Sequence, residues 1–243
     1  MLPVVSAVGL LARSAGGFAQ DGIYGYEHEV VQEKFVVQEQ DKAASQRNTS
    51  EQILERFGAK MEEHASVEMH FTFSGADKFG GAMDVLEGTI YRQGADYAVV
   101  NQQVEFYVCG NTKWIYMVEN NEAMASPHDP ASIDVVENPT ALFSAQLPKG
   151  YSFSKNPNLI IDNSLEVVEI SFTPKDKKLP YSSILLRIYL QSLTPHSVKY
   201  NAKDGSWFEA TITAYTHRNN PFPPEQFTFS QENHPGVYIT DLR

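Results

Sequence analysis

The sequence predicts a mainly β protein, in which many short antiparallel strands form one large sheet with few helices. From Ser66 onward, apolar residues such as Val67, Met69 and Phe71 alternate with polar ones, so each run has one apolar face. Gly, Asn, Asp and Pro separate the runs and supply turns. The chain has little room for repeated βαβ crossovers, which disfavours a parallel sheet. This alternation is compatible with a curved sheet, a sandwich or a barrel.

The expected strands fall into two groups on either side of an insert at residues 119–146. They are Ser66–Phe73, Leu86–Arg92, Asp96–Val100, Val104–Cys109 and Lys113–Val118, then Leu165–Phe172, Ser183–Leu190, Ser197–Asn201, Ser206–Tyr215 and Phe227–Ser230.

The first 48 residues differ in composition from this domain. Residues 1–20 contain the apolar run Pro3–Ala12 followed by small residues, the pattern of a secretory signal peptide. The alternative is a short apolar helix that is retained. Residues 21–48 form a polar extension, either a mobile leader or a short element against the domain. The sequence thus predicts export from the cytoplasm, with a mature chain that starts near Asp21.

Two helices are expected in the domain at 49–243. Thr49 and Gln52 fit a capping box, and Ile53, Leu54, Phe57 and Met61 then fall on one face of a helix that ends near His64. Within the insert, Asn138 and Pro139 fit the N-cap and first position of a short helix over 138–145. A loop with its own helix between two groups of strands is typical of a lid.

Residues that carry chemistry do not form a recognisable site. The net charge of −11 disfavours nucleic acid and anionic membrane surfaces as partners, because both carry phosphates that an acidic chain repels. The seven histidines lack metal-ligand spacing, and Cys109 has no neighbour in sequence that would activate its thiol. No nucleophile elbow or phosphate-binding loop occurs. We therefore expect no enzyme activity, no metal and no cofactor.

The remaining feature is the amount of apolar and aromatic surface on the strands. These residues either pack as an ordinary core with the helices or leave a cavity for a lipid-like ligand under a sheet with only short helices to cover it. Periodicity alone does not separate the two interpretations. If the cavity exists, its expected lining is Ile53, Phe57, Met69, Phe71, Phe73, Trp114 and Tyr116, with Leu142 and Phe143 from the lid.

Several short motifs in order resemble the LolA-like family of outer-membrane lipoprotein carriers over residues 50–243. They are Ile53-Leu54 with Ser66–Phe73, Glu87-Gly88-Thr89-Ile90-Tyr91-Arg92, Gly110–Tyr116, Asn138-Pro139 with Leu142-Phe143, Phe172-Thr173-Pro174-Lys175, and Phe227-Thr228-Phe229 with Pro235-Gly236-Val237 and Asp241-Leu242-Arg243.

The resemblance implies an unclosed half-barrel of antiparallel strands, capped by a lid of short helices, with a cavity for acyl chains. In the family an Arg followed by Pro ties the lid shut. Arg92 is the candidate for this latch, although no Pro follows it here.

The implied function is a monomeric periplasmic carrier that shields the acyl chains of lipoproteins or lipids. Its partners would be an inner-membrane transporter and an outer-membrane acceptor. The alternative is a periplasmic sensor or lipopeptide-binding domain on the same half-barrel.

Overall fold

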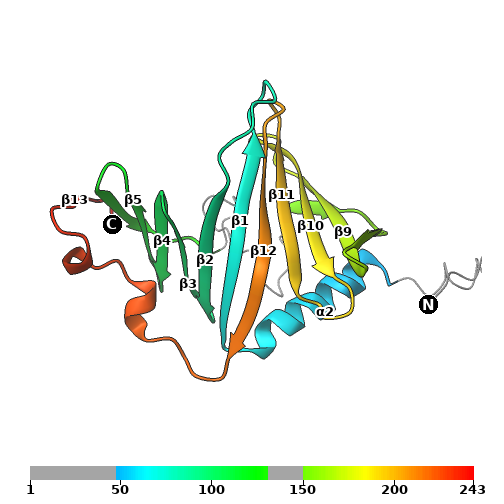
Figure 1. The fold of residues 1–243 in the computed structure, drawn as a ribbon, viewed down its shortest axis with the longest axis horizontal. Coiled ribbons are helices and arrows are strands. Elements are labelled where there is room, and N and C mark those ends of the chain that lie inside the picture. Colours follow the sequence, from blue (N-terminus) through cyan, green and yellow to red (C-terminus); the bar gives the residue numbers. More distant parts are fainter. Residues whose placement is uncertain (1–47, 131–149) are drawn as a thin grey trace, which may run out of the picture. The chain divides into compact units, whose positions relative to one another are not determined.

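The computed structural model describes residues 48–130 and 150–243, which form one α-helix, two short 3-10 helices and a single sheet of thirteen strands (Figure 1). All strand pairs are antiparallel except β13 with β6. The two edges of the sheet do not pair with each other, so the sheet is open. The predicted fold class, a mainly β protein with an unclosed antiparallel sheet and a helical cap, is confirmed.

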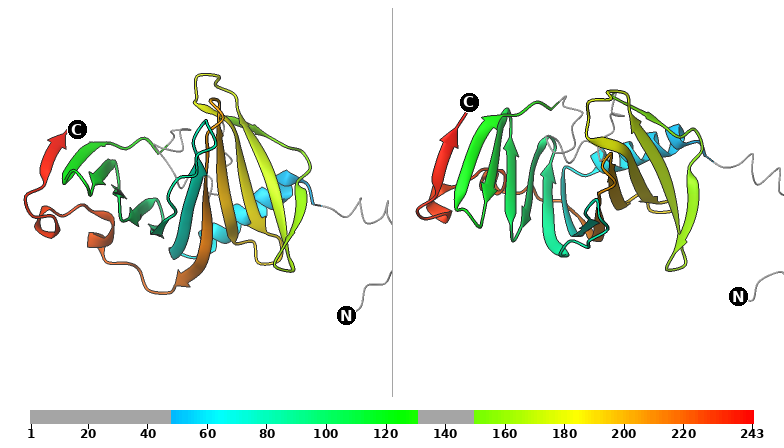
Figure 2. Two further views of the ribbon diagram at one scale, coloured as in Figure 1. Left: turned by 45° about the horizontal axis from the view of Figure 1, so that its top comes forward. Right: turned by 90° about the horizontal axis from the view of Figure 1, so that it is seen from above.

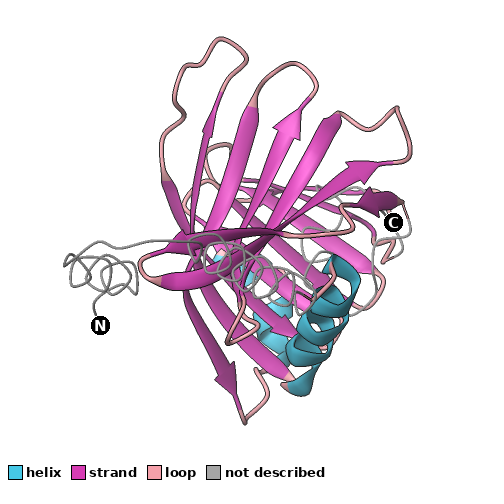
Figure 3. Ribbon diagram, turned by 90° about the vertical axis from the view of Figure 1, so that its right-hand side faces the viewer, coloured by secondary structure: helices cyan, strands magenta, loops and turns pink. Residues whose placement is uncertain are grey.

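The strands follow one another across the sheet largely in chain order, with one junction where β1 pairs with β12. From one edge to the other they are β13 (Tyr238–Asp241), β6 (Glu122–Pro127), β5 (Thr112–Met117), β4 (Val104–Cys109), β3 (Asp96–Asn101), β2 (Leu86–Gln93), β1 (Ser66–Ala76), β12 (Trp207–Arg218), β11 (Pro195–Ala202), β10 (Tyr181–Tyr189), β9 (Leu165–Pro174) and β7 (Tyr151–Phe153), with β8 (Asn158–Asp162) also on β9. Figure 3 shows these strands fanning out.

The helix α2 (Ser50–Glu63) forms as the sequence predicts. The Thr49 hydroxyl accepts a hydrogen bond from the Gln52 backbone N–H at 3.3 Å, and the Gln52 side chain accepts one from the Thr49 N–H at 2.9 Å. This capping box satisfies two N–H groups at the helix start that have no partner within the helix. Ile53, Leu54 and Phe57 are buried on one face.

The main core lies between α2 and the sheet. Apolar residues of α2 pack there with residues of β1, β2 and β9–β12, among them Met69, Ile170, Ile184 and Leu186. These four are fully buried. We call the sheet face that α2 covers the helix face; Figure 2 shows α2 beside the strands from two further directions.

The segment from Asn219 to Val237 returns from β12 to β13 along the other face of the sheet. It contains the 3-10 helices η3 (Pro224–Phe227) and η4 (Gln231–Asn233). Phe222 and Phe227 pack on Ala98 of β3, and Val237 packs on β5 and β6. We call residues 219–237 the strap, visible as the orange-to-red path in Figure 1.

The strap corrects one sequence prediction. Residues 227–230 were expected to be a strand, but η3 ends at Phe227 and no strand follows until β13. The alternation of Phe227 and Phe229 with polar residues has another cause, since both rings pack down onto the sheet.

Four further strands were not predicted, namely β6, β7, β8 and β13. The strand β6 lies inside the segment expected to be an insert, where Ala123 and Ala125 alternate but carry little apolar surface. The expected lid helix at 138–145, the signal peptide at 1–20 and nearly all of the polar extension lie outside the described residues. None of the described helices has the length and apolar run that crossing a membrane requires.

Candidate functional site

One row of apolar side chains crosses six neighbouring strands on the helix face. The register places Met69 of β1 opposite Ile90 of β2, Ile90 opposite Val99, Val99 opposite Phe106, Phe106 opposite Ile115 and Ile115 opposite Met124. Residues directly opposite in antiparallel strands point to the same face. The row therefore extends from beneath α2 to β6 next to the edge strand β13.

The burial of this row changes along its length. Met69 and Ile90 are buried in the main core, whereas Val99, Phe106, Ile115 and Met124 are only half-buried. Val104 and Met117, which pair with each other, extend the same surface. We call Val99, Val104, Phe106, Ile115, Met117 and Met124 the β3–β6 patch.

The opposite face of the same strands is covered by the strap. The Phe229 ring stacks on Trp114, with 5.0 Å between ring centroids, and lies 5.6 Å from the ring of Tyr116. His234 packs against both Phe229 and Tyr116. The structure thus places Trp114 and Tyr116, two of the expected cavity residues, on the face away from α2.

Polar groups also tie the strap to this face. His234 Nε2 lies 3.1 Å from Glu105 Oε2, and the Tyr107 hydroxyl donates to the same carboxylate oxygen at 2.6 Å. Burial and the Glu105 carboxylate raise the pKa of Tyr107, so its hydroxyl stays protonated and keeps donating. The strap is fixed by stacking and hydrogen bonds together.

The other expected cavity residues lie in or beside the main core. Ile53, Phe57, Met69 and Phe71 are buried in it, and Phe73 packs against it half-buried. Gly88 opposite Phe71 is required, because a Cβ there would lie 2.5 Å from the Phe71 ring. These residues are brought together, whereas Leu142 and Phe143 lie outside the described residues.

Arg92, the candidate latch, holds α2. Its guanidinium Nη1 donates to the carbonyl oxygen of Met61, in the last turn of the helix, at 3.1 Å. A cation is favourable there because the carbonyls at a helix C-terminus carry partial negative charge. Burial lowers the pKa of Arg92, with the Glu62 carboxylate acting in the opposite direction. Arg92 therefore links β2 to the described helical cap.

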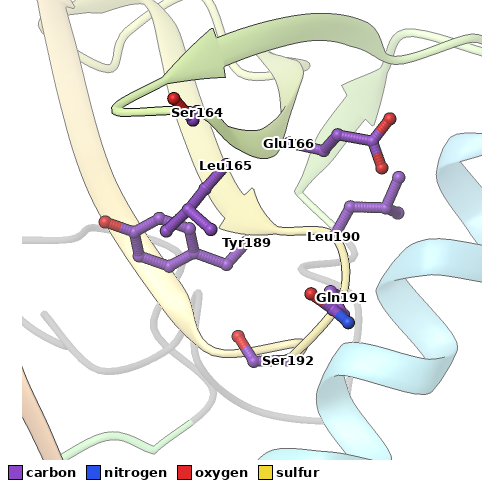
Figure 4. Close-up of a pocket in the computed structure, with 7 residues that line it drawn as sticks. All are labelled: Ser164, Leu165, Glu166, Tyr189, Leu190, Gln191 and Ser192. Atoms are coloured by element: carbon purple, nitrogen blue, oxygen red, sulfur yellow. The ribbon is translucent and has the colours of Figure 1, made fainter. Parts of the chain in front are cut away.

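A separate hollow of about 760 Å³ lies at one end of the sheet, between the β8–β9 turn and the β10–β11 turn. Figure 4 shows Glu166 and Leu190 pointing toward α2, while Leu165 and Tyr189 point away from it. It is lined by Ser164, Leu165, Glu166, Tyr189, Leu190, Gln191 and Ser192. An acyl chain that entered it would desolvate the Glu166 carboxylate, which is unfavourable. The side chains of the β3–β6 patch itself are apolar, with Lys113 and Glu122 on the same face at its borders. The patch is therefore the stronger candidate for a hydrocarbon ligand.

The groups that could carry chemistry remain scattered. Slight burial and the Asp96 carboxylate raise the pKa of the Cys109 thiol, which disfavours the nucleophilic thiolate. His196 lies 3.1 Å from Asp162, and the rings of His64 and His217 stack on each other. Within 48–130 and 150–243, no three His, Cys, Asp or Glu side chains are grouped so that they could hold a metal ion.

Sequence reasoning named the core end of the row but missed most of the β3–β6 patch. Ile115 lies between Trp114 and Tyr116, so β5 is apolar on both faces and its alternation does not reveal which face meets α2. The Met and Val residues of the patch are common in any core and gave no separate signal.

The fold places this chain in the class of open antiparallel sheets with a helix on one face. Solved structures with a similar fold include a protein of the LolA superfamily. No protein-family model and no curated protein matches the sequence. A putative outer membrane lipoprotein-sorting protein domain from Vibrio parahaemolyticus is similar at 9% identity with a TM-score of 0.43, over 72% of this chain and 95% of that one.

Two other structures are similar over nearly the same share of the chain. The LolA superfamily protein NE2245 from Nitrosomonas europaea has 12% identity and a TM-score of 0.38, over 72% of this chain and 97% of that one. The MucA/MucB complex of Pseudomonas aeruginosa has 11% identity and a TM-score of 0.34, over 74% of this chain and 62% of that one.

Proposed function

We propose that this protein is a periplasmic carrier for lipoproteins or lipids. Their acyl chains would bind on the β3–β6 patch, where they are shielded from water, and would be delivered toward the outer membrane. The observation that carries the proposal is the half-buried apolar surface of the patch. It continues the main core sideways across four strands, on the face that the strap leaves to other partners.

The hydrophobic effect explains why such a surface suits an acyl chain. Each CH₂ group that leaves water contributes about 0.8 kcal/mol, so an acyl chain along several side chains gains substantial affinity without any specific polar contact. Val99 joins the patch to the core, and Phe106 and Ile115 lie side by side at its centre. A half-buried surface also releases its ligand more readily than a closed cavity, which a carrier requires.

The remaining parts of the proposal rest on the sequence. Export follows from the apolar run in residues 1–20, and a lid with Leu142 and Phe143 follows from the helix expected at 138–145. In a carrier, an inner-membrane transporter would load the cargo and an outer-membrane acceptor would receive it.

The binding surface is tested with a fluorescent fatty acyl probe and the variant Phe106→Asp. A carboxylate at the centre of the patch would be desolvated by the acyl chain, so we expect at least roughly tenfold weaker binding. Val118→Asp is the matched control, because Val118 is exposed beside the patch on the β5–β6 turn. This variant should bind the probe as the natural chain does. Equal affinity in folded Phe106→Asp would refute the proposal.

Transfer distinguishes a carrier from the alternative, a sensor or lipopeptide-binding domain. A carrier loaded with an acylated lipopeptide should pass it to acceptor vesicles. Stable binding without transfer would favour the sensor.

A further inference from the structure

Three turns meet at one end of the sheet and form a surface that differs from the rest of the chain. They are the β1–β2 loop (residues 77–85), the β9–β10 loop (175–180) and the β11–β12 turn (203–206). Ala76 at the end of β1 pairs with Trp207 at the start of β12, and the Lys203 N–H donates to the carbonyl of Pro180 at 2.9 Å. We call these three turns together the sheet tip; two of them form the apex in Figure 1.

The β1–β2 loop holds large apolar side chains in water. Phe79 is 86% exposed, Val85 65% and Met83 50%. The Asp77 carboxylate accepts hydrogen bonds from the N–H groups of Phe79 and Gly81, both at 2.8 Å. The loop is therefore ordered with its phenyl ring outward, and exposed apolar side chains grouped in this way commonly mark an interaction site.

The sheet tip carries slightly more lysines than aspartates, whereas the chain as a whole has a net charge of −11. The exposed lysines there are Lys78, Lys175, Lys177, Lys178 and Lys203, set against the aspartates Asp77, Asp84, Asp176 and Asp204.

Three of these four aspartates are engaged with their own turns. Asp176 accepts from the Lys178 N–H at 2.8 Å, and Asp204 accepts from both the N–H and the hydroxyl of Ser206. Asp77 is held in the same way. The ammonium of Lys78 lies 5.0 Å from the centroid of the Phe79 ring. The most exposed apolar side chain of the tip therefore has a positive charge beside it.

We propose that the sheet tip docks this protein on a lipid bilayer with anionic headgroups. Phe79, Met83 and Val85 would enter the boundary between headgroups and acyl chains, and Lys78, Lys177 and Lys178 would face the lipid phosphates. The Lys203 ammonium instead donates to the carbonyl oxygen of Lys177 within the tip. Apolar insertion combined with lysine attraction is the usual basis of interfacial membrane binding. Because the rest of the chain is acidic, the same field would repel other faces and orient the tip toward the membrane.

Vesicle flotation of the full chain tests this docking. We expect binding to vesicles of phosphatidylcholine mixed with phosphatidylglycerol, and much weaker binding to phosphatidylcholine alone. Phe79→Ser should reduce the affinity for mixed vesicles about tenfold. The double change Lys177→Gln with Lys178→Gln should reduce it about as much and make it less sensitive to salt.

Matched controls come from exposed residues away from the sheet tip. Leu242→Ser removes a 58% exposed leucine beside the edge strand β13, and Lys155→Gln removes a lysine near the start of α2. Both variants should float as the natural chain does. A fluorescence blue shift of Phe79→Trp on mixed vesicles, over the background of Trp114 and Trp207, would place the apex in the bilayer.

The outcomes separate this inference from the proposed carrier function. Phe106→Asp should still dock on mixed vesicles, and Phe79→Ser should still bind the free acyl probe. Equal flotation of Phe79→Ser and the natural chain would overturn membrane docking, as would binding to neither kind of vesicle. Self-association that Phe79→Ser abolishes, without flotation, would assign the sheet tip to a second copy of the chain and also overturn it.

Discussion

The two halves of the sheet use similar alternating strands in different ways. Under α2, side chains such as Ile170, Ile184 and Leu186 are fully buried against the helix. In β3–β6 the helix face is mixed: Tyr97 and Val108 are fully buried, whereas Phe106 and Ile115 are half-buried. The strap covers the opposite face of these strands. An apolar strand face thus serves as structural core where an element covers it and as a candidate binding surface where the cover is incomplete.

The largest effect on stability is expected under α2. Phe57 is 1% exposed at the centre of the helix face, so Phe57→Ala should lower the free energy of unfolding by about 3–5 kcal/mol through lost burial and the cavity left behind. Urea unfolding followed by circular dichroism measures this. A loss as small as that for Phe106→Ala would remove the distinction between the two halves.

The second largest loss of stability is expected in the strap. Phe227 is 2% exposed where it packs on β3, and Phe227→Ala should cost about 3 kcal/mol. Because this residue lies on the face away from the β3–β6 patch, the folded variant should keep its affinity for the acyl probe. Loss of probe binding at a temperature where the variant is folded would mean that the ligand uses the strap face.

Arg92 tests how α2 is fastened to β2. Arg92→Met keeps most of the side-chain volume but removes the hydrogen bond to the Met61 carbonyl, and should cost about 1–2 kcal/mol. Arg92→Lys retains the charge and should lose less. Hydrogen exchange of the last turn of α2 should rise in the Met variant, and unchanged protection there would contradict the fastening role.

In the β3–β6 patch a truncation should affect binding more than stability. Phe106→Ala removes a half-buried ring and should cost no more than about 1–2 kcal/mol of unfolding free energy, well below the cost at Phe57. Binding of the acyl probe, measured by fluorescence titration, should weaken severalfold. An unfolding cost close to that of Phe57→Ala would show that the patch is part of the closed core.

The smallest effect is expected at the far edge of the sheet. Hydrogen bonds from Arg243 hold the pKa of Asp241 at about 2, so any stability from this pair is present above the ordinary pKa and is lost as the pH falls toward 2. The pair is exposed, and water screens it. Asp241→Asn should therefore leave the thermal midpoint at neutral pH unchanged; a clear decrease would mean that this charge pair, and not the pairing of β13 with β6, secures the edge.

Sequence reasoning succeeded where local chemistry decides the structure. The capping box at Thr49 and Gln52 and the apolar stripe after it defined α2. The strict alternation of apolar and polar residues at the start of β1 defined that strand. It failed where contacts between segments far apart in the sequence decide the structure. Nothing local to Phe227 and Phe229 indicates that they cover a sheet face formed by β3–β6.

The sequence correctly indicated an apolar surface on the strands, but the expected residues of β5 lie on the other face of the sheet. Trp114 and Tyr116 share one face of β5, but β5 is apolar on both faces, and only the register and the strap reveal that Ile115 points to the α2 side. The two large aromatic residues of β5, Trp114 and Tyr116, favoured the face that the strap covers. Which face stays open is a property of the whole fold.

Photo-crosslinking tests the central claim most directly. A fatty acid with a photoreactive group near the end of its chain would be bound to the natural protein, irradiated, and its attachment sites mapped by mass spectrometry. The account predicts attachment to Phe106, Ile115 and Met124. Attachment to Tyr107 or Trp114 on the strap side, or to Leu165 and Leu190 at the hollow, would contradict it.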